Sequence, residues 1–151
     1  DNAARIIAAA RSAGDLVVYI RHEFTSDDAP FFAPGSEGAH LHPKVQNLPD
    51  EQVILKHHVN SFLETNLATV LERHAIEDLV IVGSMSHLCI DAITRAAADL
   101  GYKATVIHDA CASCDVEFNG LTVPAAHVHA AFMSALGFGY ARVVSTEQFL
   151  A

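Results

Sequence analysis

The chain has 151 residues, of which 51% are hydrophobic and 18% charged, and this composition suits a folded globular domain rather than a disordered segment. Its formal net charge of −9 would repel phosphate backbones and anionic lipids, so neither nucleic-acid binding nor membrane binding is expected. No apolar run is long enough to span a bilayer, and the first residues lack the pattern of a signal peptide, so we expect a cytoplasmic protein.

The first half of the chain is predicted to hold two helices and two strands around a long loop. Apolar residues at helical spacing predict a helix over residues 2–13. A strand over 15–24 contains the continuous apolar run VVYI, which is typical of a strand buried on both faces. Residues 25–50, with four prolines and two glycines, form a loop of the length usual for a binding loop or lid. A short strand over 52–58 follows, and a second helix begins somewhere in 61–65.

The second half continues the alternation of strands and helices. Residues 77–84 form another apolar strand, again of the kind buried on both faces, and a helix begins near Cys89 directly after it. A strand over 103–111, a helix over 123–139 and a closing strand over 141–150 complete the chain.

Strands that alternate with helices predict a three-layer α/β/α fold with an open parallel sheet. No repeat or change in composition divides the chain, so residues 1–151 are expected to form a single domain. In such sheets, ligands bind beyond the carboxyl ends of the strands. Cys89, Lys56 and Asp109 follow or close three of the predicted strands, so a site is expected at this edge.

Cys89 is the first candidate for chemistry. Ser86 is a natural N-cap, which would place Cys89 in the first turn of its helix. The unpaired amides and the helix dipole stabilise a thiolate there, and the same amides can bind an oxyanion. A lone cysteine is more often an inert core residue, but the turn from strand to helix favours a nucleophile.

Lys56 is the second candidate, and the residues alone leave its role open. The other two lysines, Lys44 and Lys103, lie in a loop and at the start of a strand, where both are expected to be exposed. Lys56 ends the apolar run VIL, where a buried cation is costly unless it is paired. It could hold a thiol as thiolate or stabilise charge on a substrate. Alternatively, it could extend its ammonium into water.

Three segments together resemble the isochorismatase-like hydrolases, in the branch with a cysteine nucleophile: VILKHHVNSF, LVIVGSMSHLCIDAITRAAADLGY and VIHDACAS. That branch includes nicotinamidases, N-carbamoylsarcosine amidases and streptothricin hydrolase. The resemblance implies an isochorismatase-like (Rossmann-like) fold and an Asp–Lys–Cys triad, with Cys89 as the nucleophile and Lys56 as the lysine. It further implies a cis peptide bond between Ser84 and Met85 and an oxyanion hole made by the amides of Met85 and Cys89. Asp109 matches a family position that we assign to the structure at the edge of the site.

The aspartate of the family's triad has no match in the sequence. In the family it ends a first strand that precedes the first helix, and this sequence begins at that helix. Asp1 reads as a helix cap. We therefore expect about 20–35 further residues before Asp1, enough for one strand and its loop, so that the N-terminal strand is missing here.

The resemblance also bears on metal binding. Nicotinamidases carry an Asp-x-His metal motif, and the matching stretch YIRHEF places Arg21 and Glu23 where the ligands would be. An arginine cation there argues against a divalent metal, so no metal or other cofactor is expected, and His22 is a weak candidate for lining the substrate pocket. His40 and His42 could chelate at their i,i+2 spacing, although we favour ordinary hydrogen-bonding roles in a loop.

With no secretory context, the three cysteines predict no disulfide framework, and the motif CASC (111–114) lies in a late loop rather than where a redox motif would open a helix. We expect Cys111 to be packed and Cys114 to be accessible.

The sequence therefore predicts a cysteine-dependent hydrolase that acts on a small amide or related C–N bond through a thioester. A true isochorismatase is not expected, because that branch lacks the cysteine. Phe62 and the loop 25–50 are expected to shape the pocket, with a small-molecule substrate and a homodimer or homotetramer as assembly. The alternative is a non-catalytic binding or assembly subunit of the same fold.

Overall fold

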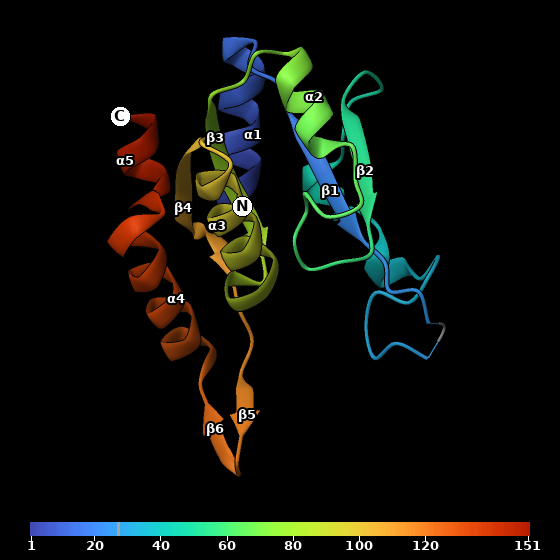
Figure 1. Ribbon diagram of the computed structural model, residues 1–151, viewed down its shortest axis with the longest axis vertical. Coiled ribbons are helices and arrows are strands. Elements are labelled where there is room, and N and C mark those ends of the chain that lie inside the picture. Colours follow the sequence, from blue (N-terminus) through green and yellow to red (C-terminus); the bar gives the residue numbers. More distant parts are fainter. Residues whose placement is uncertain (27) are drawn as a thin grey trace. The chain divides into compact units, whose positions relative to one another are not determined.

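The structure is a computed structural model that describes residues 1–26 and 28–151 (Figure 1). The helices are α1 (Asn2–Ala13), η1 (Glu37–Ala39), η2 (Pro43–Val45), α2 (Leu67–Arg73), η3 (Ser86–Ile90), α3 (Asp91–Asp99), α4 (Ala125–Gly139) and α5 (Thr146–Leu150). The strands are β1 (Val18–His22), β2 (Gln52–Lys56), β3 (Asp78–Ser84), β4 (Lys103–Ala112), β5 (Val116–Phe118), β6 (Leu121–Val123) and β7 (Ala141–Val144). The chain divides into two compact units, Asp1 with Ala3–Ala75 and Asn2 with Ile76–Ala151.

The first unit is built on the parallel pair β1 and β2. The pairing runs from Val18 opposite Gln52 to His22 opposite Lys56, so the carboxyl ends of the two strands lie together. Asp27, in the predicted loop 25–50, lies outside the described residues, and the rest of that loop includes η1 and η2. The buried apolar side chains of this unit are Ile6, Tyr19, Ala39, Ile54, Leu67, Val70 and Leu71.

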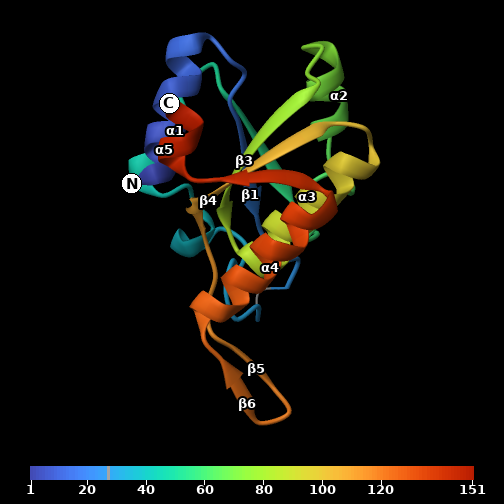
Figure 2. The ribbon, with the colours of Figure 1, turned by 90° about the vertical axis from the view of Figure 1, so that its left-hand side faces the viewer.

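The second unit is built on a parallel sheet in the order β3-β4-β7. Figure 2 shows α3 and α4 on one side of this sheet and α5 on the other. Val106 of β4 belongs to the core cluster under α3 and α4, whereas Ile107, the next residue, points to the opposite face, where α5 packs against β4. The cluster comprises Ile81, Ile90, Ala104, Val106, Met133 and Leu136.

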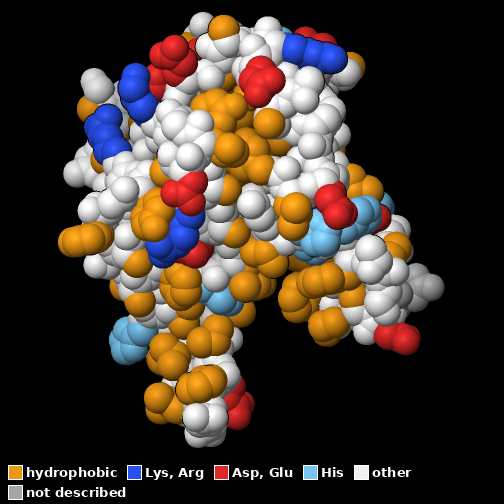
Figure 3. Space-filling model, viewed as in Figure 1, with side chains coloured by type: hydrophobic (Ala, Val, Ile, Leu, Met, Phe, Trp, Pro, Cys, Tyr) orange, Lys and Arg blue, Asp and Glu red, His pale blue; other side chains and the backbone are white. Residues whose placement is uncertain are grey.

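An antiparallel hairpin, β5 and β6, connects β4 to α4 and was not predicted. It turns at Asn119 and Gly120, whose φ angles of 51° and 75° are those of a turn that favours Asn-Gly. The Asn-Gly pair was therefore a local signal that could have identified the hairpin. Its side chains Phe118 and Leu121 are 74% and 66% exposed, and hydrophobic atoms are prominent on the projecting hairpin in Figure 3.

The parallel pairing and the first helix are confirmed, and α1 ends at Gly14 in the left-handed conformation. The predicted start of the second helix in 61–65 is wrong, because turns occupy these residues and α2 begins at Leu67. The closing strand is wrong beyond Val144: Ser145 and Gln148 form a capping box that starts α5.

The predicted burial of both faces of the third strand is also wrong at one position. Val80 of β3 is 43% exposed, on the face opposite to that of Ile81, which belongs to the core cluster. Within the described residues, no helix combines the length and apolar character needed to cross a bilayer.

Candidate active site

Cys89 lies in a helical turn directly beyond the carboxyl end of β3. The expected cis peptide bond between Ser84 and Met85 is present. The backbone N–H groups of Leu88 and Ile90 donate to the Met85 carbonyl oxygen at 3.0 and 3.2 Å, and the second bond spans five residues, which makes η3 a π-helical turn. The turn continues without a break into α3. Cys89 is therefore held on a helical segment, at the edge of the sheet where ligands bind.

A glycine shapes the end of β3. Gly83 has a φ angle of 132°, which side chains rarely tolerate, and a Cβ there would meet the Ile90 Cδ1 atom at 3.6 Å. The pairing of β3 with β4 shifts register between Ile81 and Gly83. This irregularity redirects the backbone just before the turn that carries Cys89.

Ser86 does not act as the predicted N-cap. Met85, with extended backbone, precedes the turn, and the Ser86 hydroxyl bonds elsewhere. Its Oγ donates to the Ala112 carbonyl oxygen at 3.0 Å and lies 2.7 Å from His129 Nδ1. The next residue, His87, lies with its Nδ1 2.6 Å from the Ser113 hydroxyl. The sequence reasoning missed both contacts, and no local signal could have revealed them.

The three cysteines differ in environment. Cys89 is half-buried, and Cys114 is exposed with its Sγ 3.6 Å from the Met85 Sδ. Cys111 packs against the core cluster, where burial raises the pKa of its thiol to about 11. The predictions that Cys111 is packed and Cys114 accessible are confirmed. Cys89 lies near the start of a helical segment, where the backbone amides favour the negatively charged thiolate form of a cysteine.

Lys56 ends β2 in the first unit and is buried, with only 3% of its surface exposed. Its Nζ donates to the carbonyl oxygens of His58 and Val59 at 2.9 and 2.7 Å. The alternative of an ammonium extended into water is therefore wrong. Lys44 and Lys103, by contrast, have side chains that are 64% and 74% exposed, as expected.

His22 lies opposite Lys56 in the strand pairing. Both of its ring nitrogens are buried and have no hydrogen-bond partner among the described residues. Burial lowers the pKa of His22, and the positive charge of Lys56 lowers it further. Its ring contacts Phe24 and Phe32, with centroids 4.6 and 5.9 Å apart. A neutral His22 among aromatic rings is suited to the wall of a pocket. Phe62, the other weak candidate, is half-buried.

The residues at the positions of the metal motif bond to each other. Arg21 and Glu23 form an ion pair at 3.0 Å. His42 accepts a hydrogen bond from the Lys44 amide at its Nδ1, 3.2 Å away, which is an ordinary loop role. Among the described residues, no group of three or more His, Cys, Asp or Glu side chains is arranged to hold a metal ion.

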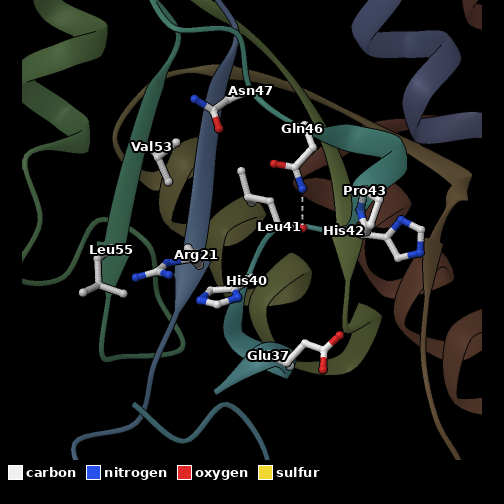
Figure 4. Close-up of a pocket in the computed structure, with 11 residues that line it drawn as sticks. Arg21, Glu37, His40, Leu41, His42, Pro43, Gln46, Asn47, Val53 and Leu55 are labelled. Atoms are coloured by element: carbon white, nitrogen blue, oxygen red, sulfur yellow. Dashed lines mark hydrogen bonds between the residues drawn. The ribbon is translucent and has the colours of Figure 1, made fainter. Parts of the chain in front are cut away.

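A cavity of about 790 Å³ lies within the first unit (Figure 4). Figure 4 shows Arg21, Val53 and Leu55 along its strand side, and the 37–47 segment with His40 along the other. Its described lining residues include no cysteine or lysine, so this cavity lacks the two residues, Cys89 and Lys56, on which the predicted chemistry depends.

Asp109 has a structural role in the second unit. Its Oδ1 accepts hydrogen bonds from the Thr146 amide and hydroxyl, both at 2.8 Å. These contacts tie β4 to the first residue of α5.

Lys56 and Cys89 belong to different units, so their cooperation stays a prediction.

Comparison with known proteins identifies the same family throughout. Residues 1–147 match the isochorismatase domain. The isochorismatase family protein YddQ of Bacillus subtilis is 43% identical, over 99% of this chain and 83% of its own length. Streptothricin hydrolase of Streptomyces noursei is 34% identical over 91% of this chain, which spans only 50% of that enzyme.

Similarity to solved structures supports the fold. The crystal structure of a protein assigned as an isochorismatase hydrolase, from Oleispira antarctica, is 58% identical with a TM-score of 0.94. The match covers 99% of this chain and 79% of that chain. The predicted α/β class with parallel strands is thereby confirmed.

Proposed function

The chain belongs to the isochorismatase family of hydrolases, and from that premise we propose that it is a cysteine hydrolase that cleaves a small amide or related C–N bond. The observation that carries the proposal is the position of Cys89, half-buried on a helical turn directly beyond the carboxyl end of β3. The similarity to streptothricin hydrolase adds support.

In the proposed reaction, the Cys89 thiolate attacks the carbonyl carbon of the substrate and forms a C–S bond. The electron pair of the carbonyl bond moves to its oxygen, and the amides of Met85 and Cys89 stabilise this oxyanion. The C–N bond then breaks, and a general acid protonates the leaving amine. The same group, now deprotonated, takes a proton from water as the water oxygen attacks the thioester, so the C–S bond breaks, the carboxylic acid is released and the thiolate is regenerated.

We propose that Lys56 keeps Cys89 ionised. Its buried ammonium, fixed by two backbone carbonyls at the end of β2, is a preorganised positive charge. His22 beside it, together with Phe62, would contribute to the wall of the substrate pocket.

We also propose a cytoplasmic protein that takes a small-molecule substrate and assembles as a homodimer or homotetramer. The odd number of cysteines, three, supports a reducing compartment. The exposed Phe118 and Leu121 of the hairpin support association with another copy.

Alkylation with iodoacetamide, followed by peptide mass spectrometry, tests the proposed nucleophile. Cys89 should be alkylated at least about tenfold faster than Cys114 at neutral pH, since a stabilised thiolate outcompetes an ordinary exposed thiol. Cys89→Ser should abolish ammonia release in a screen of small amides while preserving the circular dichroism spectrum. The matched control, Cys114→Ser, should retain that activity. Equal alkylation of Cys89 and Cys114, or full activity of Cys89→Ser, would refute the mechanism.

A further inference from the structure

We infer that His129, on α4, is a positioning residue that holds the turn bearing the nucleophile in its working geometry by means of Ser86. This inference rests on the proposed function of Cys89. His129 lies 43 positions from Ser86 in the sequence, and the fold of the second unit brings the two together.

The hydrogen-bond arrangement around Ser86 fixes which atom donates. Ser86 is fully buried, with 0% of its surface exposed. Its hydroxyl has one proton, and that proton is donated to the Ala112 carbonyl oxygen at 3.0 Å. The 2.7 Å contact with His129 must therefore be a bond that Ser86 Oγ accepts, so Nδ1 of His129 carries the proton.

The environment of His129 disfavours the charged form of its ring. Burial lowers the pKa of His129, and the nearby His108 on β4 lowers it further. With its proton on Nδ1, the ring of His129 is a donor to Ser86.

The resulting contacts tie the turn to two other elements. The bonds of Ser86 join η3 to the end of β4 and to α4. A parallel contact joins His87 to Ser113, in the segment after β4. Ser86 directly follows Met85 and precedes Cys89 by three residues, so a shift of Ser86 would move both amides proposed for the oxyanion hole. A displacement of about 1 Å in an active site can reduce the rate about hundredfold.

Two chemical probes of Cys89 separate positioning from general structural damage. 4-Nitrophenyl acetate acylates a cysteine through a tetrahedral oxyanion, with transfer of the acetyl group to sulfur and release of 4-nitrophenolate. Iodoacetamide alkylates the same thiolate by displacement of iodide and forms no oxyanion. The acylation rate therefore depends on the oxyanion hole, whereas the alkylation rate reports the thiolate alone. Cys89→Ser provides the background rate for both.

The variants are chosen by the position of the donor atom. His129→Ala removes the donor. In His129→Asn, the side-chain amide nitrogen can occupy the place of Nδ1 and keep the bond to Ser86. In His129→Gln, the amide extends further, toward the place of Nε2, so the bond to Ser86 is lost.

In the full chain, His129→Ala should reduce acylation of Cys89 about tenfold, equivalent to about 1.4 kcal/mol, and leave alkylation within about twofold. His129→Asn should restore acylation, and His129→Gln should not. If His129→Ala does not fold, the acylation rates of His129→Asn and His129→Gln, compared with each other, test the inference instead. Unchanged acylation in His129→Ala, equal acylation in the Asn and Gln variants, or a parallel fall of both rates would overturn the inference. A wild-type Cys89 with no enhanced reactivity toward either probe would instead overturn the proposed function.

Discussion

Asp109→Ala should destabilise the second unit without affecting the chemistry of Cys89. In the structure, one carboxylate oxygen of Asp109 accepts two hydrogen bonds from Thr146, each 2.8 Å long. Thr146 is fully buried, with 0% of its surface exposed. The substitution would leave its amide and hydroxyl without their acceptor, at the start of α5.

The expected loss follows from these contacts. Hydrogen bonds to a charged group contribute about 1.5–3 kcal/mol each, but Asp109 itself is exposed, and water weakens such interactions. We therefore expect a total decrease of about 2 kcal/mol in the free energy of unfolding, which is below the about 3–6 kcal/mol that two such bonds would contribute without this weakening. For a chain of this size, this lowers Tm by about 4–8 °C.

The pH dependence of the effect can be predicted from the pKa of Asp109. Burial raises this pKa, but the hydrogen bonds from Thr146 and the charge of His108 lower it more, so the net value lies below the ordinary 3.8. As pH falls, the unfolded chain therefore takes up the proton first. The stability that the Asp109 charge contributes should be fully present well above pH 3.8 and lost as pH falls through the lower pKa of the folded state.

Urea denaturation at pH 7 and pH 3 measures these differences, with Asp109→Asn as the variant that keeps an acceptor oxygen but removes the charge. A double-mutant cycle with Thr146→Val isolates the contact with the hydroxyl. A loss below about 0.5 kcal/mol for Asp109→Ala would refute the reasoning, because surface substitutions without specific contacts fall in that range. A large fall in the alkylation rate of Cys89 in Asp109→Asn would instead place Asp109 in the chemistry.

Three further predictions concern the reactive groups. Lys56→Met should slow alkylation of Cys89 by iodoacetamide at neutral pH, because it removes the cation proposed to favour the thiolate. The control is Lys103→Met, which removes an exposed lysine. Equal alkylation rates in the two variants would show that Lys56 does not stabilise the Cys89 thiolate. Cys111 should be alkylated about 100-fold more slowly than an unperturbed thiol, because its pKa rises from 9.0 to about 11. Peptide mass spectrometry measures the rate of alkylation at Cys111. Rapid labelling of Cys111 in the folded protein would contradict its burial. Treatment with a chelator should leave amide hydrolysis unchanged, because Arg21 and Glu23 pair with each other; activity lost to the chelator and restored by zinc would contradict this.

The elements that the sequence predicted well are those with local physical causes. Apolar periodicity and Gly14 defined α1, and continuous apolar runs identified the parallel strands. The resemblance of the segment around Cys89 predicted the Ser84–Met85 cis bond that the structure contains. The hairpin after β4 also has a local cause, the Asn119–Gly120 pair at its turn.

The environment of Lys56 and the contacts of Ser86 required the tertiary structure. The sequence left Lys56 open between a buried and a solvent-exposed ammonium, and its burial beside His22 follows from the pairing of β1 with β2. Ser86 looked like a helix cap, but its hydroxyl bonds to Ala112 and to His129, residues far along the chain. Local patterns record the preferences of neighbouring residues. The partner of a buried polar group is decided by which distant segments the fold brings within hydrogen-bonding distance.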